Sequence, residues 1–260
     1  MNGEKRYFSI FFKTCSMESR AFIRYPFGVF WNIIFYSGLL MFFLYSDTGI
    51  SFTEKYQYAD YKALFLMGYL AWIYAAAAVS ELSCTILEEI KQGTFYQLCS
   101  SSYPLTFLLA GKIVVKLLIQ TAVAITIFML GIIFGEIKMC FSWQLLVAFF
   151  ICILGMYGIG MGLAGLTIYY KRTHSIISML QIALLFVTDT LPSSIFSQKV
   201  SAFVPLTICN TVTRKFLAGQ NVRGDMIYFF LISGIWLLTG NFLLKYFYNK
   251  ARKKGNLLFY

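Results

Sequence analysis

Several uninterrupted apolar runs, each long enough to cross a lipid bilayer, constrain the fold of this chain more than any other feature of its sequence. A helix needs about 20 apolar residues to span the hydrocarbon core. Of the 260 residues, 59% are hydrophobic and only 13% are charged, whereas charged residues make up about a quarter of a typical soluble domain. The runs are continuous, which favours helices over alternating barrel strands. The sequence therefore predicts an all-α polytopic membrane protein.

Six runs are predicted to span the membrane, all within one transmembrane domain that covers residues 1–260. They are Phe27–Ser46, Lys62–Cys84, Leu105–Gly135, Trp143–Tyr170, Ser175–Thr190 and Met226–Tyr248. Lys and Arg concentrate on the cytoplasmic side of membrane proteins. With both ends inside, the inner segments hold 15 of the 22 Lys and Arg residues, so both termini are predicted to be cytoplasmic. Basic flanks that face anionic lipid then explain the net charge of +11 without a nucleic acid.

Two further segments are expected to lie partly in the membrane without crossing it. Residues 1–26 combine recurring aromatic side chains with basic residues on other faces, a pattern that predicts an interfacial amphipathic helix. A basic leader that only sets the topology is the alternative. Residues 191–225 contain two half-apolar pieces broken by Pro192 and Pro205. Each piece is too short to span, so this outer segment is predicted to form re-entrant or interfacial helices. The first outer loop, around Asp47–Asp60, is short and polar.

Small residues line one side of the fourth predicted span and include the pattern Gly158-x-x-x-Gly162. Such residues let two helices approach closely in lipid. Ala75–Ala78 in the second span offers a matching smooth surface. Packing within one subunit is the simpler interpretation, and a dimer interface is the alternative.

The residues needed for most catalytic or metal chemistry are missing from the sequence. No segment fits the phosphate-binding pattern G-x-x-x-x-G-K-[ST], so the chain is not expected to bind ATP by that route. His174 is the only histidine, and the six cysteines lack metal-type spacing. Cys140 and Cys209 could pair on the outer side, although two free thiols are expected. No arrangement of residues suits a hydrolase, and we expect a transport subunit rather than an enzyme.

Two carboxylates lie in or near predicted spans, where ionisable groups are costly and often functional. Glu81 is close to the inner end of its span, and Asp189 lies three residues before Pro192 at an outer end. Interfacial positions are expected for both. A proton-coupled carrier would need carboxylates nearer the midplane.

Two stretches resemble the type-two ATP-binding-cassette (ABC) exporter permeases. The first is similar to that family's first cytoplasmic loop, and consists of Glu89–Leu98 followed by Pro104-Leu105 and Gly111-Lys112. The second is similar to its last outer loop, and consists of Leu191-Pro192, Val204–Thr207, Arg214 and Leu217–Gly219. Their order agrees with the six-span topology, and the resemblance extends over essentially the whole chain.

This resemblance implies that residues 87–103 form a cytoplasmic coupling helix that docks on a separate ATP-hydrolysing subunit. Glu88 and Glu89 would then offer charges to that subunit, Gly93 would permit a sharp turn, and Thr94 would cap the following helix. An ordinary inner loop is the alternative. The resemblance also implies a bacterial cytoplasmic (inner) membrane, two ATPase subunits that carry ATP and Mg, and a second permease, identical or paralogous. No cofactor would be bound by this chain itself.

The same analogy places the substrate path between two permease subunits, with the first, second and fifth spans as walls. The candidate path residues are Phe30, Trp31, Asn32, Phe35, Tyr36, Gln181 and Asp189, with Pro192 and Pro205 in an outer gate turn. Such a lining suits an amphipathic drug, antimicrobial peptide or lipid, and a polysaccharide or lipid-linked glycan is the alternative cargo. Lipid-facing aromatic residues would give the same composition. An ion channel or proton-coupled secondary transporter is the alternative from another class.

Overall fold

The computed structural model describes residues 3–24, 26–46, 50–58, 60–101, 103, 105–137, 142–191 and 201–254. In these residues the structure is helical and contains no strand. The helices are α1 (Gly3–Arg24), α2 (Phe27–Tyr45), α3 (Ile50–Tyr56), α4 (Tyr61–Lys91), α5 (Phe95–Ser100), α6 (Leu105–Gly135), α7 (Trp143–Tyr170), α8 (His174–Val187), α10 (Pro205–Leu217) and α11 (Arg223–Lys253).

Five helices are long and apolar enough to cross a membrane: α2, α4, α6, α7 and α11. This confirms the all-α polytopic class. Helix α8, which covers the fifth predicted span, has only 14 residues and is therefore about 21 Å long. Six spans thus remain a prediction, whereas five candidate spans are present.

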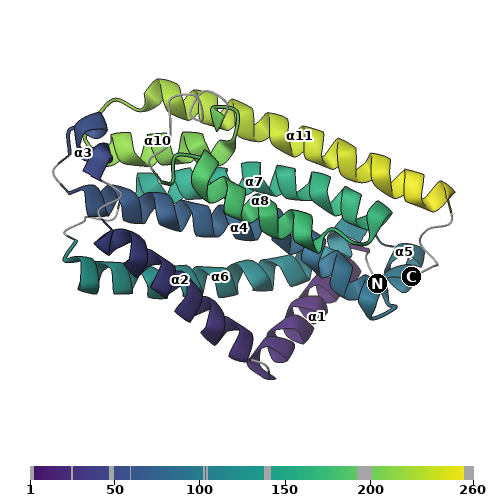
Figure 1. Ribbon diagram of the computed structural model, residues 1–260. Coiled ribbons are helices and arrows are strands. Elements are labelled where there is room, and N and C mark those ends of the chain that lie inside the picture. Colours follow the sequence, from purple (N-terminus) through teal and green to yellow (C-terminus); the bar gives the residue numbers. More distant parts are fainter. Residues whose placement is uncertain are drawn as a thin grey trace.

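Helix α4 forms the centre of the bundle. It continues to Lys91, seven residues beyond the predicted end of the second span, and 94% of its most apolar window is buried. Helices α6, α7, α8 and α10 pack around it, and α11 runs along α7 (Figure 1). Helix α3 lies at one end of this bundle, whereas α5 lies at the other, near the end of α11 (Figure 1).

The glycines of α7 are used for packing within the chain, as the simpler interpretation predicts. A Cβ atom at Gly158 would overlap the backbone of α11 at Trp236, and one at Gly240 would overlap the Gly158 carbonyl. On the other side of α7, a Cβ atom at Gly160 would lie 2.6 Å from the Ala78 carbonyl oxygen of α4. Because α4 and α11 cover this small-residue surface, the dimer-interface alternative is wrong for it.

Helix α1 packs against the first half of α6 rather than standing apart from the bundle. Gly111 makes this approach possible, because a Cβ atom there would lie 2.8 Å from the Thr14 side chain. The Cys15 thiol also contacts the Gly111 carbonyl oxygen at 3.4 Å. The predicted N-terminal helix is therefore present and docked.

Helix α10 lies inside the bundle and runs from its middle toward its end. Its first residue, Pro205, contacts Gly155, which lies midway along α7, whereas Arg214 reaches the Leu64 carbonyl in the first turn of α4. A re-entrant position of this helix in the membrane stays a prediction. Cys209 of α10 is a free, buried thiol, whereas Cys140 and Pro192 lie outside the described residues.

Candidate functional site

The connection between α4 and α6 begins with a tight turn whose residues are set by backbone hydrogen bonding. The Gly93 amide donates to the Ile90 carbonyl at 3.1 Å, and the Thr94 amide donates to the Glu89 carbonyl at 3.0 Å. This pair of bonds is the Schellman motif, which ends a helix at a residue with positive φ. Gly93 has φ +73°, a conformation that costs little only for glycine. The sharp turn predicted at Gly93 is therefore present.

The Glu89 carboxylate points into the protein and not toward solvent. It lies 2.5 Å from the Lys112 ammonium group of α6, and it accepts a hydrogen bond from the Thr94 hydroxyl. Its side chain is almost completely buried. From the sequence, Glu89 was expected to present its charge to an ATPase subunit, and Thr94 was expected to cap the following helix. In the structure Thr94 precedes α5 but makes no side-chain capping bond, because its hydroxyl is used by Glu89.

Two lysines of α6 form ion pairs with acidic residues of α4 and α1 beside this turn. Lys116 contacts Glu88 at 3.1 Å and Glu81 at 3.6 Å, both on α4. Lys112 also lies 3.9 Å from Glu18 of α1. The Glu88 side chain is 55% exposed, so this residue remains accessible from outside. We call these ion pairs the α4–α6 charge network; they fix the turn relative to α1 and α6.

Helix α5 presents one side to the bundle and the other to the surroundings. Phe95 is buried in the same apolar cluster as Leu109 of α6 and Ile168 of α7. Tyr96 is 49% exposed, and Gln97 beside it is exposed as well. Burial raises the pKa of the Cys99 thiol above its ordinary value, and this outweighs the effect of a bond to Tyr248. The tip formed by the turn and α5 is thus anchored on one side and accessible on the other.

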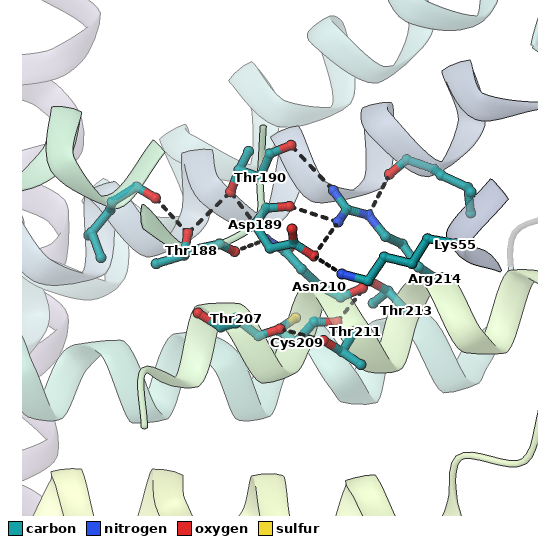
Figure 2. A network of polar contacts seen from close by, with 12 residues as sticks. Lys55, Thr188, Asp189, Thr190, Thr207, Cys209, Asn210, Thr211, Thr213 and Arg214 are labelled. Atoms are coloured by element: carbon teal, nitrogen blue, oxygen red, sulfur yellow. Dashed lines mark hydrogen bonds and ion pairs between the residues drawn. The ribbon is translucent and has the colours of Figure 1, made fainter. Parts of the chain in front are cut away.

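A second group of polar side chains connects α3 and α10 to the residues that follow α8 (Figure 2). Arg214 of α10 is fully buried, and its guanidinium group contacts the Asp189 carboxylate at 3.3 Å. Lys55 of α3 lies 3.0 Å from the same carboxylate oxygen. The Arg214 guanidinium also stacks on the Phe52 ring at 3.8 Å, a cation–π contact. We call these four side chains, with Asn210, the buried charge cluster.

Side chains of α10 bind the backbone of the three residues that follow Val187, where α8 ends. Buried carbonyl groups outside a helix need donors, and here α10 provides them. Arg214 donates to the carbonyls of Asp189 at 2.7 Å and Thr190 at 3.3 Å, and Asn210 donates to that of Thr188 at 2.9 Å. Asp189 itself adopts φ +57°, which ends the helical path. The backbone carbonyls that follow Val187 therefore accept hydrogen bonds from side chains of α10 instead of from the amides of a continuing helix.

The sequence predicted an interfacial position for Asp189, and it singled out Arg214 only within the stretch that resembles the last outer loop of the exporter permeases. Asp189 is buried and paired, and Arg214 fits only because Gly68 of α4 lacks a side chain. A Cβ atom at Gly68 would lie 2.6 Å from an Arg214 nitrogen. The available signal was two opposite charges in neighbouring apolar segments, because ionisable groups at membrane depth usually pair with one another.

The predicted substrate-path residues fall into three groups. Phe30, Trp31, Asn32 and Phe35 are exposed on α2. Tyr36 and Gln181 are half-buried against α4, where the Tyr36 carbonyl accepts from Tyr69 at 2.7 Å and Gln181 donates to the Ala76 carbonyl at 3.1 Å. Asp189 belongs to the buried charge cluster. The structure therefore does not bring these residues into one site within the single chain.

Two cavities lie elsewhere in the bundle, and neither is lined by those residues. One, of about 700 Å³, is almost wholly apolar and lies between α4, α6 and α7. The other, of about 450 Å³, lies between α7, α10 and α11. In the described part of the chain no group of three or more His, Cys, Asp or Glu side chains could hold a metal ion. Compared with known protein families the chain matches none, and no curated protein gives a significant match.

Proposed function

We propose that this chain is the membrane-spanning permease subunit of an ATP-driven ABC exporter in a bacterial cytoplasmic membrane. The observation that carries the proposal is the anchored tip between α4 and α6. A short helix, fixed by the Schellman turn and the α4–α6 charge network, presents Tyr96 and Gln97 outward. A rigid, accessible helix between two spans is suited to receive a push from a soluble partner. In this proposal α8 is the fifth of six spans, and both termini are cytoplasmic.

In the proposed mechanism, α4 moves as a rigid helix and transmits the displacement through the bundle. Closure of two ATPase subunits, which carry ATP and Mg, would displace α5 and the turn at Gly93. Because Glu89 pairs with Lys112 of α6, the displacement is shared between α4 and α6. Rigid elements with two arrangements give such coupling a physical carrier. The interfacial helix α1 would move with α6, because Glu18 of α1 contacts Lys112 of α6.

The exposed aromatic face of α2 supports a second permease as partner, identical or paralogous. Phe30, Trp31 and Phe35 are each more than half exposed, and a substrate path between two such faces would suit an amphipathic drug, antimicrobial peptide or lipid. A polysaccharide or lipid-linked glycan is the alternative cargo, since aromatic rings also stack on sugars. A proton-coupled carrier finds less support, because the buried Asp189 carboxylate already contacts two cations that hold the fold together.

Copurification with the ATPase subunit tests the proposal. The product of the neighbouring gene would be coexpressed with this chain, and complex formation and ATP turnover would be measured. Tyr96→Ala should weaken the complex by about tenfold or more, because exposed aromatic residues often dominate interfaces. Tyr170→Ala is the matched control, since Tyr170 is also exposed but lies outside α5. Absence of any copurifying ATPase from the unmodified chain, or equal effects of the two substitutions, would contradict the proposal.

A further inference from the structure

The cavity of about 450 Å³ between α7, α10 and α11 has an apolar floor and a cationic rim. It lies where α7 and α11 begin, at the end of the bundle opposite α5 (Figure 1). Its rim carries Gln144 and Arg223. Its apolar lining includes Leu145, Ala148, Val212, Phe216, Met226 and Ile227.

Among the described residues, no acidic side chain balances the charge at the rim. Arg223 is exposed, and no carboxylate lies within salt-bridge distance of it in the described part of the chain. The nearest acidic residue in sequence, Asp225, is already paired with Lys215 at 2.7 Å. An apolar cavity with an unpaired guanidinium group at its edge is complementary to an amphiphile with an anionic head.

The surroundings of the cavity indicate which amphiphile is available. Helices α7 and α11 are both long and apolar enough to cross a membrane, so side chains exposed on their outer surfaces would contact lipid. Ile227 at the cavity edge is 66% exposed, and the cavity therefore opens toward that lipid. Guanidinium groups bind phosphate oxygens through two parallel hydrogen bonds.

We propose that this cavity binds one anionic phospholipid of the bilayer, with an acyl chain in the apolar floor and the phosphate at Arg223. The site does not depend on the exporter function, because it needs only the membrane and the cavity. It does bear on the buried charge cluster. Val212 and Thr213 line the cavity, and the next residue of α10, Arg214, holds Asp189. A lipid that fills the cavity therefore supports α10 in the position that the cluster needs.

Lipid titration of the purified full-length chain tests this site. Thermal unfolding in detergent would be followed while dioleoylphosphatidylglycerol or dioleoylphosphatidylcholine is added. We expect saturable stabilisation by the anionic lipid at a concentration about tenfold lower than for the zwitterionic lipid, the effect of one charge-assisted contact. Arg223→Gln should remove this preference. Arg252→Gln, which removes an exposed cation at the far end of α11, should keep it.

Covalent labelling gives a second result that needs no substitution. Phosphatidylglycerol with a diazirine in its acyl chain should crosslink to the unmodified chain at Phe216 or Met226. Equal stabilisation by the two lipids, equal losses in the two variants, or crosslinks confined to helices other than α7, α10 and α11 would overturn the proposal. Should Arg223→Gln not fold, the crosslinking pattern decides alone.

Discussion

Replacing Arg214 by leucine tests whether the buried charge cluster holds α10 and α8 together. Arg214 is fully buried, pairs with the Asp189 carboxylate and donates to the carbonyls of Asp189 and Thr190. Removing one partner of a buried ion pair costs about 3–5 kcal/mol. Lys55 remains beside Asp189 after the change, which favours the low end of that range. Each carbonyl left without its donor adds about 1 kcal/mol.

We therefore expect Arg214→Leu to lower the free energy of unfolding by about 5 kcal/mol. Unfolding by sodium dodecyl sulfate in mixed micelles, followed by circular dichroism, measures the change. Lys215→Leu is the matched control in the next position of α10. The Lys215 and Asp225 side chains are each about one-third exposed, so losing their ion pair should cost only about 0.5 kcal/mol.

A double-mutant cycle isolates the ion pair from the carbonyl contacts. The loss of unfolding free energy caused by Asp189→Asn should be about 2 kcal/mol smaller in the Arg214→Leu background than in the unmodified chain. In that background the carboxylate has already lost its ion pair with Arg214, so removing its charge costs less. The reasoning is refuted if Arg214→Leu and Lys215→Leu destabilise equally, or if the cycle shows no coupling. Arg214→Lys should recover only part of the stability, since lysine cannot reach several carbonyls from one planar group.

Two further predictions concern helix packing and the α5 tip. Gly158→Ala should destabilise the chain by about 2 kcal/mol, because the added methyl group overlaps the α11 backbone at Trp236. Gly234→Ala is its control: no atom lies within 4 Å of a Cβ there, and its midpoint in the same detergent titration should not fall. Cys99 should react with a maleimide more slowly than a free cysteine at about pH 7, because a raised pKa leaves less thiolate. Mass spectrometry over a pH series measures this, and equal rates would contradict the burial of this thiol.

The five long apolar helices and the turn at Gly93 could be predicted because their signals are local. Continuous apolar runs fix helices by length alone, and a glycine followed by threonine after a charged helix end indicates a left-handed C-terminal turn. The direction of the Glu89 side chain had no such signal. Its partner Lys112 lies 23 positions later, on another helix. Which face of a helix end meets a neighbouring helix depends on tertiary packing. The sequence alone therefore could not distinguish the buried Glu89 carboxylate from an exposed one.

The α3 segment carried a signal that sequence reasoning did not use. The loop was expected to be short and polar, but Phe52 and Tyr56 stand four residues apart and are both buried. Residues at this spacing share one face of a helix. Lys55 lies between them in sequence and reaches Asp189, 134 positions later. The amphipathic pattern was visible, whereas its function in covering Arg214 depends on contacts that only the fold brings together.

Both charged regions are built on α4, and this has a mechanical consequence under the exporter proposal. Glu89 lies near one end of α4, and Gly68, which makes room for Arg214, lies near the other. The helix has 31 residues without proline and is about 46 Å long. Helices bend sharply at proline or at a break in their hydrogen bonding, and α4 contains neither over this span. A displacement of the α5 tip would therefore be transmitted to the Arg214 contact with the Leu64 carbonyl instead of being absorbed along the way.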